Sequence, residues 1–302
     1  MNKIVITGPT GAIGYALIKK ALSQNMKVLA VVRPENRKLD AFRSDDNFSI
    51  CECDIRNYSD IKIDEKYDAF IHLAWASPFG EERNNEDIQN LNVQYELDAV
   101  HLAKRLGCKE FIGAGSQAEY GPHDGNITEK TVPEPVTAYG KAKIKACNEA
   151  SELCKDLGIS FFWTRIFSVY GIGEKSYTLT SACIENFLKN KCPALSPCIQ
   201  IWDYINSDDT ADAFFSILEK GTPGEIYNVA SGQYRELRCF VQDIYDDIKP
   251  GCDLVFGKGS YYKNQVMSLK ADVTKLKGTG WKPETDFKDG IHKLIEYKKA
   301  TV

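Results

Sequence analysis

Residues 3–14 of this 302-residue chain read Lys-Ile-Val-Ile-Thr-Gly-Pro-Thr-Gly-Ala-Ile-Gly. The first five of them predict a short buried strand, the three glycines predict a turn, and apolar spacing up to Leu22 predicts a helix directly after it. A strand, a glycine turn and a helix form the phosphate-binding unit of dinucleotide-binding folds, because glycine lets the backbone approach a pyrophosphate at the helix N-terminus. The GxxGxxG spacing is a weak signal alone, but its place directly after the first strand strengthens it.

Strands and helices are predicted to alternate downstream of this unit. The pattern predicts a long helix over 88–106 that ends at Gly107, and a helix from Tyr139 to about Leu157. This alternation predicts an α/β, Rossmann-type doubly wound parallel sheet with helices on both faces. Further strands are expected at 28–32, 49–53, 69–74, 111–115 and 226–229, and a sixth that starts at Ser160 and continues through Gly171.

The alternation of strands and helices becomes less regular after the sixth strand. A helix is expected near 180–188, and another over 211–218 with Ser207-Asp208-Asp209 as its N-cap cluster. Two more helices are expected near 236–247 and 287–298. We therefore expect a cofactor-binding domain over 1–170, to which 205–230 return, and a smaller substrate-binding region over 171–204 and 231–302.

Composition excludes several classes of function. The net charge of −4 includes no basic block, so no nucleic-acid footprint is expected. No apolar run reaches membrane length and the first strand begins too early for a signal peptide, so we expect a cytoplasmic protein that binds no membrane. Its ten cysteines should then be reduced, with Cys51 and Cys53 on one face of a buried strand. The four histidines have no metal-ligand spacing, so no metal site is predicted.

Tyr139 and Lys143 form the main candidate for proton chemistry. Residues four apart on a helix lie on one face. A free tyrosine has a pKa of about 10, and a nearby lysine charge favours the phenolate and lowers that value. The pair could move a proton to or from an alcohol or carbonyl oxygen. Because the motif is short and common, it needs a cofactor and a second hydroxyl, for which Ser116 at the end of a predicted strand is the candidate.

Arg33 stands where the second predicted strand ends. A carboxylate at this place would bind the ribose hydroxyls of NAD, whereas Arg33, with Arg37 and Lys38 just beyond, suits the 2′-phosphate of NADP. We therefore expect NADP(H) to be preferred, while Glu35 keeps NAD(H) open.

Several motifs occur together and in a fixed order. They are Thr7-Gly8-x-x-Gly11-x-x-Gly14, His72-Leu73-Ala74, Asn92, Ser116-x-x-x-Tyr120-Gly121, Tyr139-x-x-x-Lys143, Arg165 before Tyr170-Gly171, Asp208-Asp209, Tyr227-Asn228-Val229 and Gly280-Trp281-Lys282-Pro283. Over nearly its full length the chain resembles the extended short-chain dehydrogenase/reductase family, the NAD(P)-dependent sugar epimerase, dehydratase and reductase group.

The resemblance implies roles for named residues. Ser116 would hydrogen-bond the reacting oxygen, Tyr139 would be the acid/base, and Lys143 would lower its pKa and hold the nicotinamide ribose. The implied cofactor set is Gly8, Thr10, Gly11, Ala12, Ile13, Gly14, Arg33, Asp54, Ile55, Leu73, Ala74, Trp75, Asn92, Ala114, Tyr139, Lys143, Ile166 and Phe167. The implied substrate set is Ser116, Ser168, Gln200, Trp202, Asn264 and Gln265. Trp202 stands where many members that act on nucleotide sugars carry a diphosphate-binding arginine.

One departure from the family narrows the reaction. The 4,6-dehydratases follow the active-site Ser/Thr with Asp-Glu, and here Gln117-Ala118 replace them. Reduction and epimerisation remain. Arg33 points to NADP(H) exchanged at every turnover, and hence to a reductase of a nucleotide-linked 4-keto-6-deoxy sugar. A nucleotide-sugar 4-epimerase with bound NAD is the alternative, and a non-catalytic NADP sensor is disfavoured because the tyrosine is kept. The family also implies a homodimer formed through the helix at 88–106 and the helix that bears Tyr139.

Overall fold

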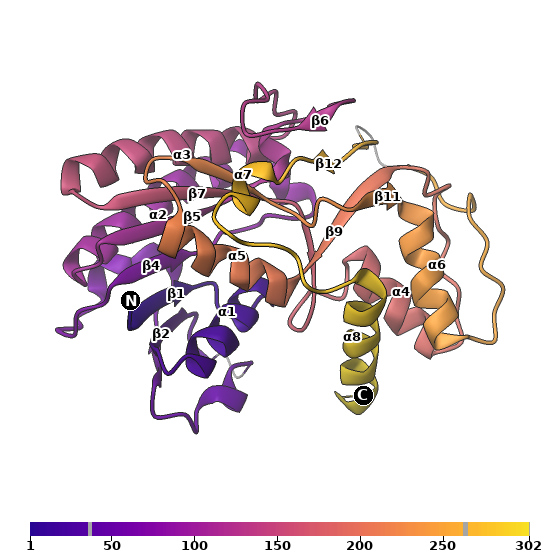
Figure 1. Cartoon of the computed structure of the whole chain (residues 1–302), viewed down its shortest axis with the longest axis horizontal. Helices are drawn as coiled ribbons and strands as arrows, with labels where there is room; N and C mark the ends of the chain where they lie inside the picture. Colours follow the sequence, from indigo (N-terminus) through magenta and orange to yellow (C-terminus); the bar gives the residue numbers. More distant parts are fainter. Residues whose placement is uncertain (36–37, 262–264, 302) are drawn as a thin grey trace.

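A seven-stranded parallel sheet forms the larger part of the molecule (Figure 1). The computed structural model describes residues 1–35, 38–261 and 265–301. The strand order is β10-β7-β5-β4-β1-β2-β3. From β1 the chain adds strands in one direction as far as β3, and from β4 it adds them in the other direction as far as β10. In open sheets of this kind ligands bind at that switch point, beyond the carboxyl ends of the strands. The strands are β1 (Lys3–Thr7), β2 (Lys27–Val32), β3 (Phe48–Glu52), β4 (Ala69–His72), β5 (Glu110–Ser116), β7 (Ser160–Ile166) and β10 (Ile226–Val229).

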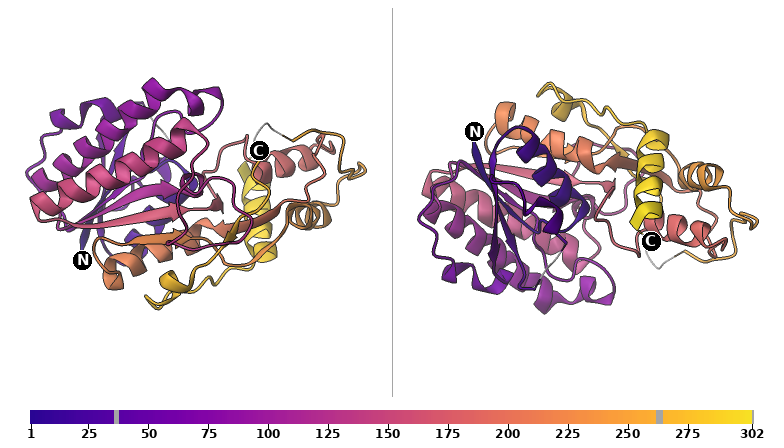
Figure 2. Two further views of the ribbon diagram at one scale, coloured as in Figure 1. Left: turned by 90° about the horizontal axis from the view of Figure 1, so that it is seen from above. Right: turned by 90° about the horizontal axis from the view of Figure 1, so that it is seen from below.

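Helices cover both faces of this sheet, as the two views of Figure 2 show. Helices α1 (Ala12–Ser23) and α5 (Ser207–Lys220) share one hydrophobic core with Ile4 and Ile6 of β1. The opposite core contains Val5 together with α2 (Glu86–Arg105) and α3 (Ala138–Leu157). Because successive side chains of a strand point to opposite faces, the run Ile-Val-Ile feeds both cores. The prediction of a Rossmann-type α/β fold is confirmed.

A separate hydrophobic core lies among α4 (Leu179–Leu188), α6 (Leu237–Ile248) and α8 (Phe287–Thr301). We call this part the α4–α6–α8 region; it lies to the right of the sheet in Figure 1. The small strands and remaining helix are β6 (Asn126–Ile127), β8 (Ser168–Tyr170), β9 (Ile201–Asn206), β11 (Tyr234–Glu236), β12 (Lys270–Ala271) and α7 (Thr274–Lys277). The 3₁₀ segments in the described residues are η1 (Asp40–Phe42), η2 (Ile55–Asp60), which is kinked at Asn57, η3 (Glu81–Asn84) and η4 (Gln117–Glu119).

Two local expectations are wrong. The strand from Ser160 does not continue to Gly171: it breaks at Phe167, whose N–H donates to Val229 O at 3.0 Å, and β8 then pairs with β9 in another sheet. Helix α5 begins earlier than expected, because the Asn206 side chain is the N-cap and accepts from Asp208 N at 2.8 Å. Both errors come from hydrogen-bond partners that local sequence does not specify.

The cysteines also differ in part from expectation. Cys51 and Cys53 do pack on the same side, but they are half-buried because β3 is an edge strand. Cys192 and Cys252 form a disulfide with a Cα–Cα distance of 5.9 Å, so the expectation that all thiols are reduced is wrong for this pair. Their separation of 60 residues gave no hint of it, since they follow α4 and α6, which pack together only in the fold.

No helix in the described ranges combines the length and the apolar character needed to cross a membrane. The same residues contain no group of three or more His, Cys, Asp or Glu side chains arranged to hold a metal ion.

Candidate active site

A cavity of about 520 Å³ opens at the carboxyl ends of the central strands. The glycine turn after β1 forms its floor. Gly8 has φ +64°, and a Cβ there would lie 2.8 Å from Ala74 N, so only glycine lets this turn pack on the end of β4. Gly14 is equally restricted, since a Cβ would lie 2.5 Å from Pro9 Cα.

The start of α1 is suited to an anion. Its N-cap is Gly11, and within residues 1–35 its first turn has neither a side-chain cap nor an acidic residue. The N–H groups and the positive end of the helix dipole therefore face the cavity without competition from the chain itself. Together with the glycine turn, this arrangement fits the pyrophosphate of a nicotinamide dinucleotide.

Ser116 and Tyr139 meet at the opposite wall. Ser116 ends β5, and its hydroxyl accepts from Ala118 N at 3.2 Å in a capping box with Glu119. Helix α3 is capped by Thr137, whose hydroxyl accepts from Gly140 N at 3.1 Å, and this places Tyr139 in the first turn. Ser116 and Tyr139 both line the cavity, and the Ser116 side chain lowers the pKa of Tyr139. The predicted hydroxyl pair is therefore assembled.

Lys143 lies one turn further along α3. Its Nζ donates to Ala114 O at 2.6 Å and lies 3.3 Å from the ring centroid of Trp75 and 5.9 Å from that of Tyr139. Burial lowers the pKa of Lys143 to about 8. Burial raises the pKa of Tyr139, whereas the Ser116 side chain and the charge of Arg83 lower it. That Lys143 lowers the pKa of this phenol stays a prediction.

Arg83 is a site residue that the sequence did not indicate. It belongs to η3, between β4 and α2, and its Cζ lies 4.8 Å from the ring centroid of Tyr139. The path of a polar loop is not encoded in a periodic pattern, so nothing in the sequence linked Arg83 to Tyr139, which follows 56 positions later.

Asn92 supports the cavity wall instead of lining it. It is 1% exposed, and its amide accepts from Ala76 N at 2.7 Å and donates to Ala76 O at 3.0 Å. These bonds fix the loop that carries Trp75, whose indole N–H donates to Gln89 Oε1 at 2.8 Å. The implied cofactor contact of Asn92 is therefore indirect.

The other predicted residues divide into two groups. Those that line the cavity are Gly8, Gly11, Ala12, Ile13, Gly14, Leu73, Trp75, Ala114, Ser116, Tyr139, Lys143, Ile166, Phe167, Ser168 and Trp202. Those that do not line it are Thr10, Arg33, Asp54, Ile55, Ala74, Asn92, Gln200 and Gln265. Asn264 lies outside the described residues.

Three members of the second group have defined surroundings. Asp54 accepts from Arg56 Nε at 2.7 Å, and that hydrogen bond lowers the pKa of its carboxyl. Gln200 directly precedes β9, is 3% exposed, and its Oε1 is buried without a hydrogen-bond partner among the described residues. The Gln265 amide donates to Val266 O at 3.0 Å. No substrate contact by Gln200 or Gln265 follows from this arrangement.

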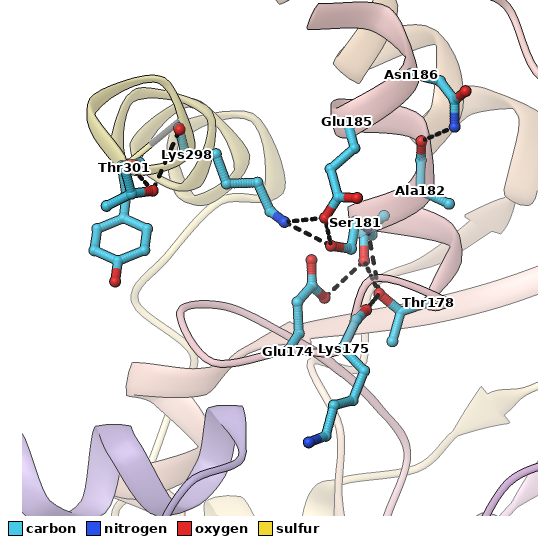
Figure 3. Close-up of polar contacts among 11 residues, drawn as sticks. Glu174, Lys175, Thr178, Ser181, Ala182, Glu185, Asn186, Lys298 and Thr301 are labelled. Atoms are coloured by element: carbon cyan, nitrogen blue, oxygen red, sulfur yellow. Dashed lines mark hydrogen bonds and ion pairs between the residues drawn. The ribbon is translucent and has the colours of Figure 1, made fainter. Parts of the chain in front are cut away.

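The segment between β8 and α4 closes another side of the cavity. At Gly173, a Cβ would come within 3.3 Å of Gly11 C, so this segment packs directly on the glycine turn. Glu174 and Lys175 follow, and Figure 3 shows them diverging. The Glu174 carboxylate accepts from Thr180 at 2.8 Å, and burial raises its pKa to about 7. Lys175 points away from the contacts that Lys298 makes with α4 (Figure 3).

Two exposed aromatic rings meet beside this segment. Phe79, which lines the cavity from the loop before η3, is 51% exposed, and Tyr177 is 58% exposed. Their ring centroids are 5.1 Å apart. The pair thus joins the loop after β4 to the segment after β8.

The doubly wound sheet, the glycine turn and the Ser116–Tyr139–Lys143 set define a nicotinamide-dinucleotide enzyme that works on a C–O centre. The model of the NAD dependent epimerase/dehydratase family matches residues 4–230, and the chain belongs to this family. It is accordingly an NAD(P)-dependent enzyme.

Similar proteins cover nearly the whole chain. CDP-abequose synthase of Salmonella typhimurium is 25% identical over 97% of both chains. The dTDP-4-dehydro-6-deoxyglucose reductase of Escherichia coli is 26% identical over 98% of this chain and 97% of its own. Among solved structures, UDP-glucuronic acid 4-epimerase from Bacillus cereus, in complex with UDP-glucuronic acid and NAD, has a TM-score of 0.84 at 21% identity, covering 99% of this chain and all of its own. The last likeness is one of fold.

Proposed function

We propose that this enzyme reduces a nucleotide-linked 4-keto-6-deoxy sugar with NADPH and releases a deoxysugar nucleotide. The similarity to a dTDP-4-dehydro-6-deoxyglucose reductase supports this substrate class. We also propose that residues 1–170 with 205–230 bind the cofactor, and that 171–204 with 231–302 bind the sugar nucleotide.

The observation that carries the choice of NADPH is a convergence of cations. Burial lowers the pKa of Lys175, and the positive charges of Lys38 and Arg33 lower it further. These residues come from three places in the chain and Lys175 lines the cavity, so positive charge gathers beside it. A 2′-phosphate on the adenosine ribose is an anion of suitable charge and is a strong hydrogen-bond acceptor.

The site supplies the groups needed for ketone reduction. When bound, NADPH supplies the hydride that reaches the ketone carbon. Tyr139 gives its proton to the ketone oxygen, and Ser116 hydrogen-bonds that oxygen as negative charge grows on it. Removing such a donor typically costs about 3 kcal/mol of transition-state stabilisation. The products are the alcohol and NADP⁺, which must leave before the next turnover.

After Ser116 this site lacks the acid pair that water elimination requires. Gln117 and Ala118 follow Ser116, and the next residue, Glu119, is an acid that is fully buried. Its carboxylate accepts from Arg165 Nε at 2.7 Å and from the Trp163 indole at 3.0 Å. Glu119 is therefore committed to the core beneath the site.

A nucleotide-sugar 4-epimerase with retained NAD is the second candidate, because such epimerases share this fold. The decisive experiment is a screen of nucleotide 4-keto sugars with NADPH, following cofactor oxidation and identifying the product. We expect one NADPH oxidised per alcohol formed. Purified protein that carries NAD and interconverts nucleotide sugars without net cofactor oxidation would establish the epimerase instead. NADPH binding with no turnover of any sugar would favour the sensor.

The cofactor preference is tested by Arg33→Asp. Hydrogen bonds to charged groups contribute about 1.5–3 kcal/mol, so we expect wild type to prefer NADPH roughly ten- to a hundredfold over NADH. In the variant the preference should vanish or invert, since a carboxylate repels the phosphate and accepts from ribose hydroxyls. Lys109→Asp makes the same charge change just before β5, at the amino ends of the strands and so away from the cavity, and should leave both affinities unchanged. Equal affinity of wild type for both cofactors would contradict the NADPH assignment.

A further inference from the structure

Tyr139 is surrounded by charged groups from several elements. Arg83 approaches from η3 and Lys143 from α3, at 4.8 and 5.9 Å from the Tyr139 ring centroid. Glu119 of η4 also acts on the phenol, in the opposite sense. Proton donation leaves a phenolate behind, so a cation beside this ring favours the step and an anion opposes it.

Of the two cations, Arg83 has fewer other contacts. Lys143 Nζ donates to Ala114 O and covers the face of Trp75. In the part of the chain that the structure describes, the Arg83 guanidinium makes no ion pair and no side-chain hydrogen bond, and its Nε is buried without a partner. Its Cζ lies over the ring of Tyr139, 4.8 Å from the ring centroid.

The turn that carries Arg83 is held in place. Gln89, which is buried, donates its amide to Ser77 O at 3.0 Å and to Glu82 O at 3.1 Å. The Ser77 hydroxyl also donates to the Glu82 carboxylate. Helix α2 begins directly afterwards, with Asn85 as its N-cap. The backbone of the turn that places Arg83 beside Tyr139 is thus held by the chain itself, as preorganised electrostatic stabilisation requires.

We propose that Arg83 stabilises the phenolate of Tyr139 in addition to Lys143, to which the family resemblance gave this task. Arg83 is thus a positioning residue that acts through Tyr139. The proposal rests on Tyr139 being the proton donor in the proposed function. The ionisation of this phenol can nevertheless be measured without turnover.

The first experiment follows the phenol directly. A difluorotyrosine, which is more acidic than tyrosine, is placed at position 139, and its ionisation is followed by fluorine NMR. An opposite charge at about 4–6 Å typically lowers a pKa by ~1–3 units, so Arg83→Met should raise the pKa of this phenol by about one unit or more. Arg83→Lys should keep it within about half a unit of the parent. Lys141→Met, on the exposed side of the same helix, removes one positive charge outside the cavity and should leave it unchanged.

Arg83→Gln provides a second neutral variant if Arg83→Met fails to fold. If the phenol of either folded neutral variant has the same pKa as in the parent, the proposal is overturned. An equal shift in Lys141→Met would overturn it too, because that would reflect net charge alone.

The second experiment uses turnover of a nucleotide 4-keto sugar with NADPH. Loss of Arg83 should lower kcat about tenfold or more, change KM little, and move the basic limb of the kcat profile to higher pH, while Arg83→Lys restores most of the rate. A fall in kcat without movement of this limb would show a merely structural role. If no sugar is turned over, the proposed function fails, whereas the fluorine titration still decides the role of Arg83.

Discussion

Tyr139 carries the chemistry at the scale of single residues. It lines the cavity together with Ser116, so Tyr139→Phe removes the proton donor and leaves the walls in place. General acid catalysis typically contributes ~10²–10⁴ in rate, and we expect turnover to fall at least a hundredfold. Cofactor affinity, measured by fluorescence titration of NADPH, should be nearly unchanged. Turnover like that of wild type would remove Tyr139 from the mechanism.

Glu96 is a buried acid beneath the site with a predictable effect on stability. Burial raises its pKa from 4.5 to about 8. The native state keeps this proton up to about pH 8, whereas the unfolded chain releases it near 4.5, so this group makes the free energy of unfolding fall as pH rises through that window. The slope contributed by one proton is at most about 1.4 kcal/mol per pH unit.

Glu96→Gln should therefore flatten the pH dependence of stability. We expect the variant to lose less stability than wild type between about pH 5 and 8, as measured by urea unfolding at several pH values. Glu152→Gln makes the same change on the exposed side of α3 and should behave like wild type. An unchanged slope in Glu96→Gln would show that Glu96 is ionised in the native protein.

Strand β5 shows how elements are fitted together at the next scale. A Cβ at Gly115 would lie 2.2 Å from Trp163 Nε1 and 2.5 Å from Glu119 Oε1, both of them buried. Gly115→Ala must therefore displace Trp163 or Glu119, the carboxylate that accepts from both Trp163 and Arg165, and overpacking of this kind typically costs ~1–3 kcal/mol. Urea unfolding measures it. Gly251→Ala, where the nearest atom is 3.6 Å away, is the control and should change stability little. Equal stability of both variants would mean that β5 can shift to accept a side chain.

At the scale of elements, the sequence predicted the central sheet and its helices better than the segments that follow β7. The seven parallel strands and their covering helices follow from apolar runs, which are local. The break at Phe167 depends on Val229, and the strand β9 depends on pairing with β8 and β11, so neither is visible in one stretch of sequence. The same limit applies to the site. Ser116, Tyr139 and Lys143 are found by motif, whereas Arg83 is brought in by a loop whose course is set by Gln89.

At the scale of the whole molecule, we predict a homodimer. Helices α2 and α3 pack side by side on one face of the sheet, and Leu91 of α2 is 52% exposed. An isologous contact would join this face to its copy as a four-helix bundle. Light scattering should give twice the chain mass at micromolar concentration, and Leu91→Lys should shift it toward the monomer. Val132→Lys, in an exposed loop, should not. A monomeric wild type would contradict the prediction.

The Phe79–Tyr177 ring pair has a consequence for the turnover rate of the enzyme. Aromatic pairs contribute only about 0.5–1.5 kcal/mol beyond buried area, so this contact can open and close many times in one catalytic cycle. A reductase must release one dinucleotide and admit another in each cycle, whereas an epimerase that retains NAD exchanges only its sugar. If the rings separate whenever a dinucleotide passes, their separation sets a limit on the turnover rate of a reductase. An epimerase that retains its NAD has no such limit. Lid opening and product release limit many enzymes, and here the lid would consist of two side chains.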